Sequence, residues 1–127
     1  MSFTSPYANM IGARRNSATG EPIITIGWHD EIEGRPGFLH GGVIAGLLEM
    51  ACYEALSQEL RDQEAMPRLK PINIAVDYLR GGLMTDTHAV AQVVRVGKRV
   101  ANASAVCWQD DRSKPIATAR MHILLDR

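Results

Sequence analysis

The stretch FLHGGVIAGLLEMACYEALSQEL at residues 38–60 decides the fold, because it holds the one long helix around which the other segments can pack. Its apolar side chains recur at the three- and four-residue spacing of one helical face. They are Val43, Ile44, Leu47, Leu48, Ala51, Ala55 and Leu56. No charge stands between His40 and Glu49, whereas charged and amide side chains accumulate after Tyr53. The pattern predicts a helix that is buried on most sides and reaches solvent toward its C-terminal end.

Two features of this helix are unusual. Glu49 stands among leucines and a methionine. Burial of an unpaired charge is expensive, so its carboxylate either points through a gap in the apolar surround or is held there for chemistry. Gly41 and Gly42 stand where the helix begins. Glycines permit close approach of a ligand, and the free N–H groups and the positive end of the helix dipole suit a developing negative charge.

One chain cannot bring these two features to one reaction. Gly41 and Glu49 are eight residues apart, which is roughly 12 Å along a helix axis, and a glutamate side chain recovers only part of that distance. Two such helices placed antiparallel across a two-fold axis would bring Gly41 of one subunit near Glu49 of the other, twice. The spacing therefore predicts a homodimer with two composite sites.

The segments on either side of the helix have the patterns of strands. Residues 7–14 are expected to form a short strand or edge, residues 16–22 a turn, residues 23–28 the returning strand of a hairpin, and residues 30–37 a loop. After the helix, period-two alternation predicts four strands in an up-and-down antiparallel run, at residues 71–79, 88–96, 99–109 and 115–125. Small residues on one face of the third of these strands leave room for the helix.

The predicted fold class is therefore α+β, with an antiparallel sheet of five or six strands wrapped around one long central helix. All of residues 1–127 are expected to form a single domain, and the exposed sheet edges favour an oligomer.

Composition and motifs exclude several functions. Fourteen basic and fourteen acidic residues cancel, so no field recruits nucleic acid or an anionic membrane. The N-terminal residues lack the apolar core of a signal peptide and no run approaches membrane-spanning length, so the expected location is cytoplasmic. Cys52 and Cys107 are expected to be buried thiols, and the four histidines have no metal-ligand spacing. There is no GxSxG elbow, Walker loop, dinucleotide fingerprint or HExxH helix.

The element order, the HGG motif and an acid nine residues after its histidine resemble the hotdog-fold acyl-CoA thioesterases of the phenylacetate-pathway (PaaI) type. The resemblance covers the chain from about Gly34 to the end. The matching residues are Leu39-His40-Gly41-Gly42, Glu49, and the run Val76-Asp77-Tyr78-Leu79-Arg80.

The resemblance implies a role for each residue of the predicted catalytic set, His40, Gly41, Gly42 and Glu49. The Gly41 N–H would polarise the thioester carbonyl, and Glu49 from the partner subunit would act as general base on water or attack directly to give an anhydride. His40 would shape the mouth of the site. The chain departs from the family at Gly34, where members often have Asn or Gln, and near Pro71, where some have Ser or Thr to hold the water. Its acid is also a glutamate where aspartate is common.

The resemblance further implies acyl-CoA as substrate, no metal or other cofactor, and assembly as a homodimer and then a homotetramer. Basic residues that could meet the phosphates of CoA are Arg80, Arg95, Lys98 and Arg99. The last three are equally typical of an ordinary exposed turn. Apolar residues that could line an acyl pocket are Met50, Tyr53, Leu83 and Met84.

Structural readings of the same residues stay open. Glu49 could be a partly exposed helix residue satisfied by a neighbour, the two glycines could serve close packing, and His40 could be a helix cap. A non-catalytic acyl-CoA binding or sensing module on the same fold is the alternative function, and it would have no need of a carboxylate beside the thioester. Hydratases on this scaffold use an Asp/His pair in another loop, which the sequence lacks.

Overall fold

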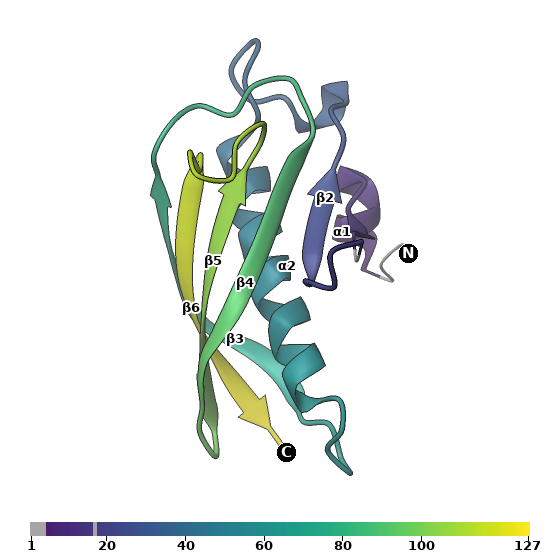
Figure 1. Cartoon of the computed structure of the whole chain (residues 1–127), viewed down its shortest axis with the longest axis vertical. Coiled ribbons are helices and arrows are strands. Elements are labelled where there is room, and N and C mark those ends of the chain that lie inside the picture. Colours follow the sequence, from purple (N-terminus) through teal and green to yellow (C-terminus); the bar gives the residue numbers. More distant parts are fainter. Residues whose placement is uncertain (1–4, 17) are drawn as a thin grey trace.

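A computed structural model describes residues 5–16 and 18–127. Two helices are present, α1 (Pro6–Ile11) and α2 (Gly41–Leu60), together with a 3-10 turn at Asp30–Ile32. Six strands form one antiparallel sheet, and they are β1 (Arg14–Asn16), β2 (Ile23–Ile26), β3 (Arg68–Tyr78), β4 (Thr87–Val96), β5 (Val100–Trp108) and β6 (Ala117–Asp126). The sheet curves along one side of α2, and α1 lies on the β2 side of that helix (Figure 1). The predicted α+β class is confirmed.

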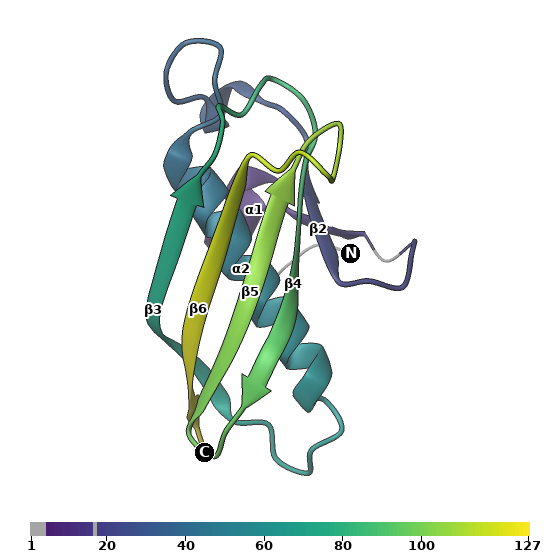
Figure 2. The same cartoon turned by 60° about the vertical axis from the view of Figure 1, so that its left-hand side comes forward.

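The order of the strands differs from the predicted up-and-down run. The sheet has the order β1-β2-β4-β5-β6-β3, so β3 pairs with β6 and β4 pairs with β2. Figure 2 shows β3 at one edge of the sheet, with the connection to β4 crossing above β5 and β6. Pro71 gives a physical reason, because proline lacks a ladder donor and is tolerated on edge strands and at bulges. Pro71 lies on this edge strand, at a register shift between Pro71 and Asn73.

Residues 7–14 form mainly a helix and not the predicted strand. The side chain of Ser5 accepts a hydrogen bond from the Ala8 N–H, and Pro6 occupies the first turn of α1. Gly12 ends the helix at φ 76°, a left-handed conformation that favours glycine. Ala8 and Ile11 are buried, which docks α1 on the rest of the molecule. The strand follows only at β1.

The core lies between α2 and the inner face of the sheet. Leu47, Leu48 and Leu56 of α2 are fully buried. They pack toward a strand face of small side chains on β5, which consists of Ala101, Ala103, Ala105 and Cys107, all buried. The prediction that small residues on this strand accommodate the helix is confirmed. Gln58 and Glu59 are exposed, as expected for the C-terminal end of α2.

One face of α2 remains partly uncovered in the single chain. Its residues Ala45, Gly46, Glu49, Met50 and Tyr53 are only partly buried. Both cysteines are free and buried, and burial raises the pKa of the Cys52 thiol to about 12. In the part of the chain that the structure describes, no helix is long and apolar enough to cross a membrane.

Candidate functional site

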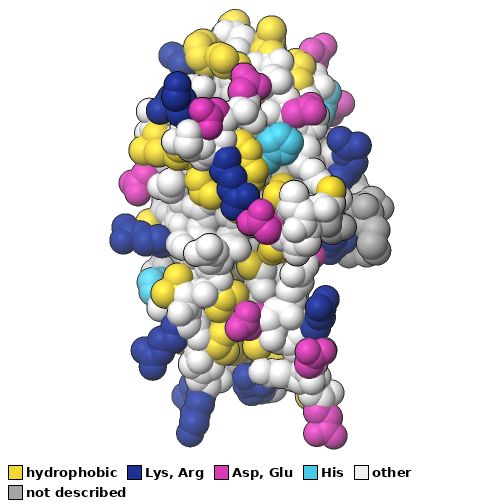
Figure 3. Space-filling view, in the orientation of Figure 1, with side chains coloured by type: hydrophobic (Ala, Val, Ile, Leu, Met, Phe, Trp, Pro, Cys, Tyr) yellow, Lys and Arg dark blue, Asp and Glu magenta, His cyan; other side chains and the backbone are white. Residues whose placement is uncertain are grey.

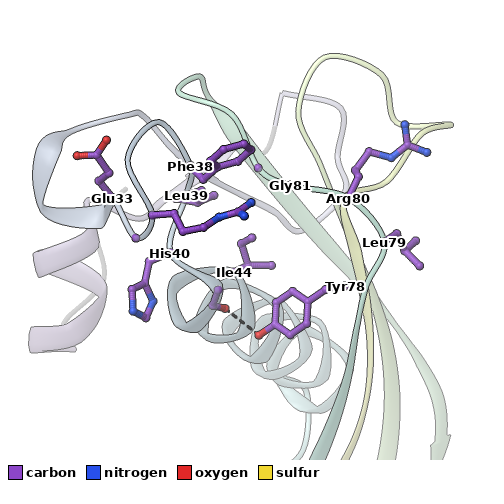
Figure 4. A pocket seen from close by; sticks show the side chains of 13 residues that line it. Glu33, Phe38, Leu39, His40, Ile44, Tyr78, Leu79, Arg80 and Gly81 are labelled. Carbon is purple, nitrogen blue, oxygen red and sulfur yellow. Dashed lines mark hydrogen bonds between the residues drawn. The ribbon is translucent and has the colours of Figure 1, made fainter.

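A pocket of about 700 Å³ lies at the N-terminal end of α2. We call it the mouth pocket. Its walls come from the loop before α2, from the first turn of α2, and from the end of β3 with the glycines that follow it. His40 and Tyr78 lie on either side of the start of the helix (Figure 4). The HGG motif (residues 40–42) and the end of the run that resembles the family (residues 76–80) therefore meet at the mouth pocket.

His40 is the N-cap of α2. Its Nδ1 accepts a hydrogen bond from the Gly42 N–H at 2.9 Å, and its carbonyl accepts from the N–H groups of Val43 and Ile44. Gly42 is required for this cap, because a Cβ there would lie 2.9 Å from Cε1 of His40. Within residues 5–16 and 18–127, no hydrogen bond uses the Gly41 N–H. The cap uses the Gly42 N–H and leaves the Gly41 N–H available to donate to a ligand.

Tyr78 holds the first residue of α2 from the opposite side. Its hydroxyl donates to the Gly41 carbonyl at 2.9 Å, the bond drawn dashed in Figure 4. The aromatic ring lies against Gly41, with its nearest atom 3.6 Å from where a Cβ would stand. Tyr78 stands in the run of residues 76–80 that resembles the family, and the sequence predicted no role for it. Its position fixes the peptide next to the free donor.

Steric hindrance explains why position 34 is a glycine. A Cβ on Gly34 would lie 2.9 Å from the Cα of His40, a backbone atom that cannot move aside easily. The loop is closed here by hydrogen bonds from the Gly34 N–H to the Phe38 carbonyl and from the His40 N–H to the Ile32 carbonyl, both 2.9 Å. The polar side chain that family members often have at this position does not fit this backbone.

Glu49 lies in a different pocket, of about 510 Å³, between α1 and α2. We call it the trough, and it is lined by Ser5, Tyr7, Ala8, Arg15, Gly46, Glu49, Met50, Tyr53, Glu54 and Ser57. Burial raises the pKa of the Glu49 carboxyl. Burial and the nearby Glu49 charge raise the pKa of Tyr53 to about 12, and the same two causes raise that of Tyr7.

Glu49 has no counter-charge among the residues that the structure describes. Among the described residues, none makes a hydrogen bond or an ion pair with its carboxylate. The structural alternative, a glutamate satisfied by a neighbour, therefore finds no support. A half-buried carboxylate whose charged form is disfavoured is a typical candidate for proton transfer, because its pKa moves toward the working pH.

The two pockets share no lining residue. Gly41 faces the mouth pocket and Glu49 faces the trough, so a single chain presents the two predicted catalytic groups in separate places. This is the separation that the helical spacing predicts.

The remaining predicted residues divide between the ends of the molecule. Arg80 lines the mouth pocket, where the guanidinium of Arg35 also lies 4.3 Å above the Phe38 ring. Arg95, Lys98 and Arg99 are exposed around the turn between β4 and β5, at the opposite end of α2. Lys and Arg side chains gather around this lower end in Figure 3. Of the four basic residues predicted to meet the CoA phosphates, the structure thus brings only Arg80 to the mouth pocket of its own chain.

The predicted acyl-pocket residues also divide. Met50 and Tyr53 line the trough. Leu83 and Met84 lie exposed in the connection between β3 and β4 and line neither pocket of the single chain. Tyr7 of α1 lines the trough and was missed, because the sequence analysis placed residue 7 in a strand.

Comparison with known proteins identifies the family. The model of the Thioesterase superfamily matches residues 36–116, which include α2, Glu49 and most of the residues that line the mouth pocket. The chain belongs to this superfamily, and its six-stranded sheet packed on one long helix is the hotdog fold.

A more particular similarity is to the medium/long-chain acyl-CoA thioesterase YigI of Salmonella typhimurium. The identity is 31% over 104 residues, covering 72% of this chain and 62% of the relative. The chain thus spans less than two thirds of that relative's length.

Solved structures agree on the fold. A protein of Chromobacterium violaceum is 34% identical, with a TM-score of 0.71 over 98% of this chain and 85% of that one. A phenylacetic acid degradation-related protein of Ralstonia eutropha is 20% identical, with a TM-score of 0.79 over 96% and 92% of the two chains. The second similarity concerns the fold alone.

Proposed function

We propose that this protein is an acyl-CoA thioesterase of the phenylacetate-pathway type, which hydrolyses an acyl- or aryl-acyl-CoA to the free acid and CoA. The observation that carries the proposal is the pair of unused groups on α2. The Gly41 N–H has no partner among the described residues, and the Glu49 carboxylate is half-buried without a counter-charge. The similarity to an acyl-CoA thioesterase supports the substrate class.

The two groups divide the reaction between them. The thioester carbonyl oxygen accepts a hydrogen bond from the Gly41 N–H at the positive end of the helix dipole, which stabilises the oxyanion of the tetrahedral intermediate. Glu49 of the partner subunit takes a proton from water as the oxygen of that water bonds to the carbonyl carbon. The carbon–sulfur bond then breaks, and the thiolate of CoA leaves and takes up a proton. Direct attack by the carboxylate, through an anhydride that water then opens, uses the same geometry.

The surface of the single chain supports a dimer. β3 is an edge strand with no strand on its outer side, and Ile72 and Leu79 on and beside it are exposed. Exposed apolar edges are covered in stable proteins. The partly uncovered face of α2, which includes Glu49, is the second apolar surface that a partner copy would meet.

A two-fold dimer would also bring distant basic residues to the substrate. If the helices run antiparallel, the turn between β4 and β5 of one subunit approaches the start of α2 in the other. The partner's Lys98 and the partner's Arg99 would then join Arg80 around the CoA phosphates. In this proposal the basic residues at the turn between β4 and β5 bind substrate in the site at the partner's Gly41 and not in the site at Gly41 of their own chain.

The test is release of the CoA thiol from a panel of short, medium, long and aryl acyl-CoAs. We expect turnover by the wild type and a loss of about 10²- to 10⁴-fold in Glu49→Gln, which removes the base but keeps the shape. Glu59→Gln, an exposed glutamate of the same helix, is the matched control and should retain activity. If the wild type and Glu49→Gln bind acyl-CoA equally and neither releases thiol, the protein is a binding module and the proposal fails.

A further inference from the structure

Tyr7 of α1 lies in close contact with α2. A Cβ at position 46 would lie 2.5 Å from the Tyr7 hydroxyl oxygen and 2.8 Å from Cε2 of its ring, so the ring lies directly on Gly46. The hydroxyl donates to the Gly42 carbonyl at 3.4 Å. Position 46 must be glycine for the ring to lie there, and no space remains between the ring and the helix.

This contact closes one end of the trough. Gly46 is one turn before Glu49, a distance of roughly 4.5 Å along the axis. Beyond Glu49 the lining continues to Ser57 and includes an ion pair, in which Nε of Arg15 lies 2.8 Å from Oε1 of Glu54. The trough therefore runs along α2 from the Tyr7 ring, past Glu49, to the Arg15–Glu54 ion pair and Ser57.

The side chains between these two ends favour an apolar ligand. Ala8, Met50 and Tyr53 contribute apolar surface, and the volume of about 510 Å³ is within the range of small-molecule sites. An acyl group whose carbonyl carbon lies within reach of Glu49 has this space beside it.

We propose that Tyr7 is a specificity-determining residue, whose ring ends the acyl subsite at Gly46 and so limits the length of the acyl group that the site accepts. The inference rests on the proposed function and adds the acyl subsite and its limit. A smaller side chain at position 7 opens the trough along α2 toward Gly42. Acyl groups too long for the wild-type trough then fit.

The main test compares Tyr7→Ala with the wild type on straight-chain acyl-CoAs of increasing length. We expect the ratio of kcat/KM for the longest substrates to that for the shortest to rise about tenfold or more, since a single methylene in an apolar pocket is worth at least about tenfold. Tyr7→Phe keeps the ring and loses only the hydroxyl, so it should keep the wild-type ratio. Tyr7→Leu keeps an apolar side chain on Gly46 and covers the case in which the alanine variant does not fold, with a smaller rise expected.

Met10→Ala is the matched control for α1. Met10 is on the same helix and 52% exposed, and it does not line the trough. It should leave the length profile unchanged. If Tyr7→Ala or Tyr7→Leu folds and its profile equals that of Met10→Ala, Tyr7 does not set the specificity.

A binding measurement separates this inference from the proposed function. In the Glu49→Gln background the dissociation constants of the same acyl-CoAs report the subsite without turnover. A wild type that releases no thiol contradicts the proposed function, yet a shift of about tenfold toward long chains when Tyr7→Ala is added still supports the subsite. Equal dissociation constants with and without Tyr7→Ala at every chain length, or no acyl-CoA binding at all, overturn it.

Discussion

The start and the middle of α2 present their candidate catalytic groups in opposite ways. At the start, residues 40–42 offer a backbone N–H, and two side chains fix it, the His40 ring through Gly42 and the Tyr78 hydroxyl through the Gly41 carbonyl. In the middle, Glu49 offers a carboxylate that no residue within 5–16 and 18–127 fixes, and burial raises its pKa. In the proposed mechanism the first region stabilises negative charge and the second receives a proton. The proposed reaction needs both groups, and one helix places them in separate pockets.

After the loss expected of Glu49→Gln, the largest effect is expected from removal of the donor at the start of α2. Gly41→Pro deletes the N–H at the first helical position, where proline is favoured, and His40 already has the extended conformation (φ −63°, ψ 130°) that a following proline requires. We expect kcat to fall about 10²- to 10³-fold with the helix retained. Thiol release and far-ultraviolet circular dichroism are the two measurements. An active Gly41→Pro enzyme would remove the first region from the mechanism.

The pH dependence tests the middle of the helix. Glu49 must be deprotonated to act as base, and burial raises its pKa above the ordinary value of 4.5. We therefore expect kcat/KM to fall on the acid side, with an inflection above 4.5, and to level off as pH rises. The measurement is the kcat/KM profile from pH 4 to pH 8, with unfolding followed in parallel. An inflection at or below 4.5 would contradict the burial of the acting carboxylate.

A smaller effect is expected when the support of Gly41 is weakened. Tyr78→Phe keeps the ring against Gly41 and removes the hydroxyl that donates to its carbonyl. Loss of one such hydrogen bond is worth about 1 kcal/mol, so kcat should fall about three- to tenfold with KM nearly constant. A rise in KM with kcat unchanged would show that Tyr78 serves binding and not the orientation of the donor.

The smallest effect concerns stability. Because the folded-state pKa of Glu49 is raised, its ionisation costs stability as pH rises through the unfolded and then the folded pKa. Glu49→Gln should therefore unfold at a slightly higher temperature than the wild type at pH 7, and the difference should vanish near pH 4. Thermal unfolding at the two pH values measures this. A variant less stable at pH 7 would mean that the carboxylate has a stabilising partner in the assembled protein.

The sequence predicted α2 well, because a 20-residue helix repeats its apolar spacing several times. It did not predict α1, which at six residues is too short for a periodic pattern. The serine-proline pair at its start and Gly12 at its end were the available signals. Period-two patterns predicted the strands and the buried face of β5 but not which strands are neighbours, so the position of β3 beside β6 was missed. Alternation within a strand carries no information about which strand lies next to it.

The candidate site divides in the same way. Gly41 and Glu49 were predicted from local features, namely their spacing on one helix and the apolar surround. Tyr78 and Tyr7 act through contacts that span 37 and 39 positions of the chain, and no local pattern reports such contacts. Gly34 was noted as a departure from the family, and only the loop geometry gives its steric reason.

The most direct test of the central claim is subunit mixing, which asks whether Gly41 and Glu49 of different chains form one site. After equal amounts of Gly41→Pro and Glu49→Ala are unfolded and refolded together, half of the dimers are mixed, and each should carry one intact composite site. We expect recovery of about one quarter of the wild-type activity. Wild type mixed with the Gly41→Pro/Glu49→Ala double variant should also give about one quarter, because both sites of each mixed dimer are broken. No recovery in the first mixture and about one half in the second would place both residues in the site of one chain and contradict the account.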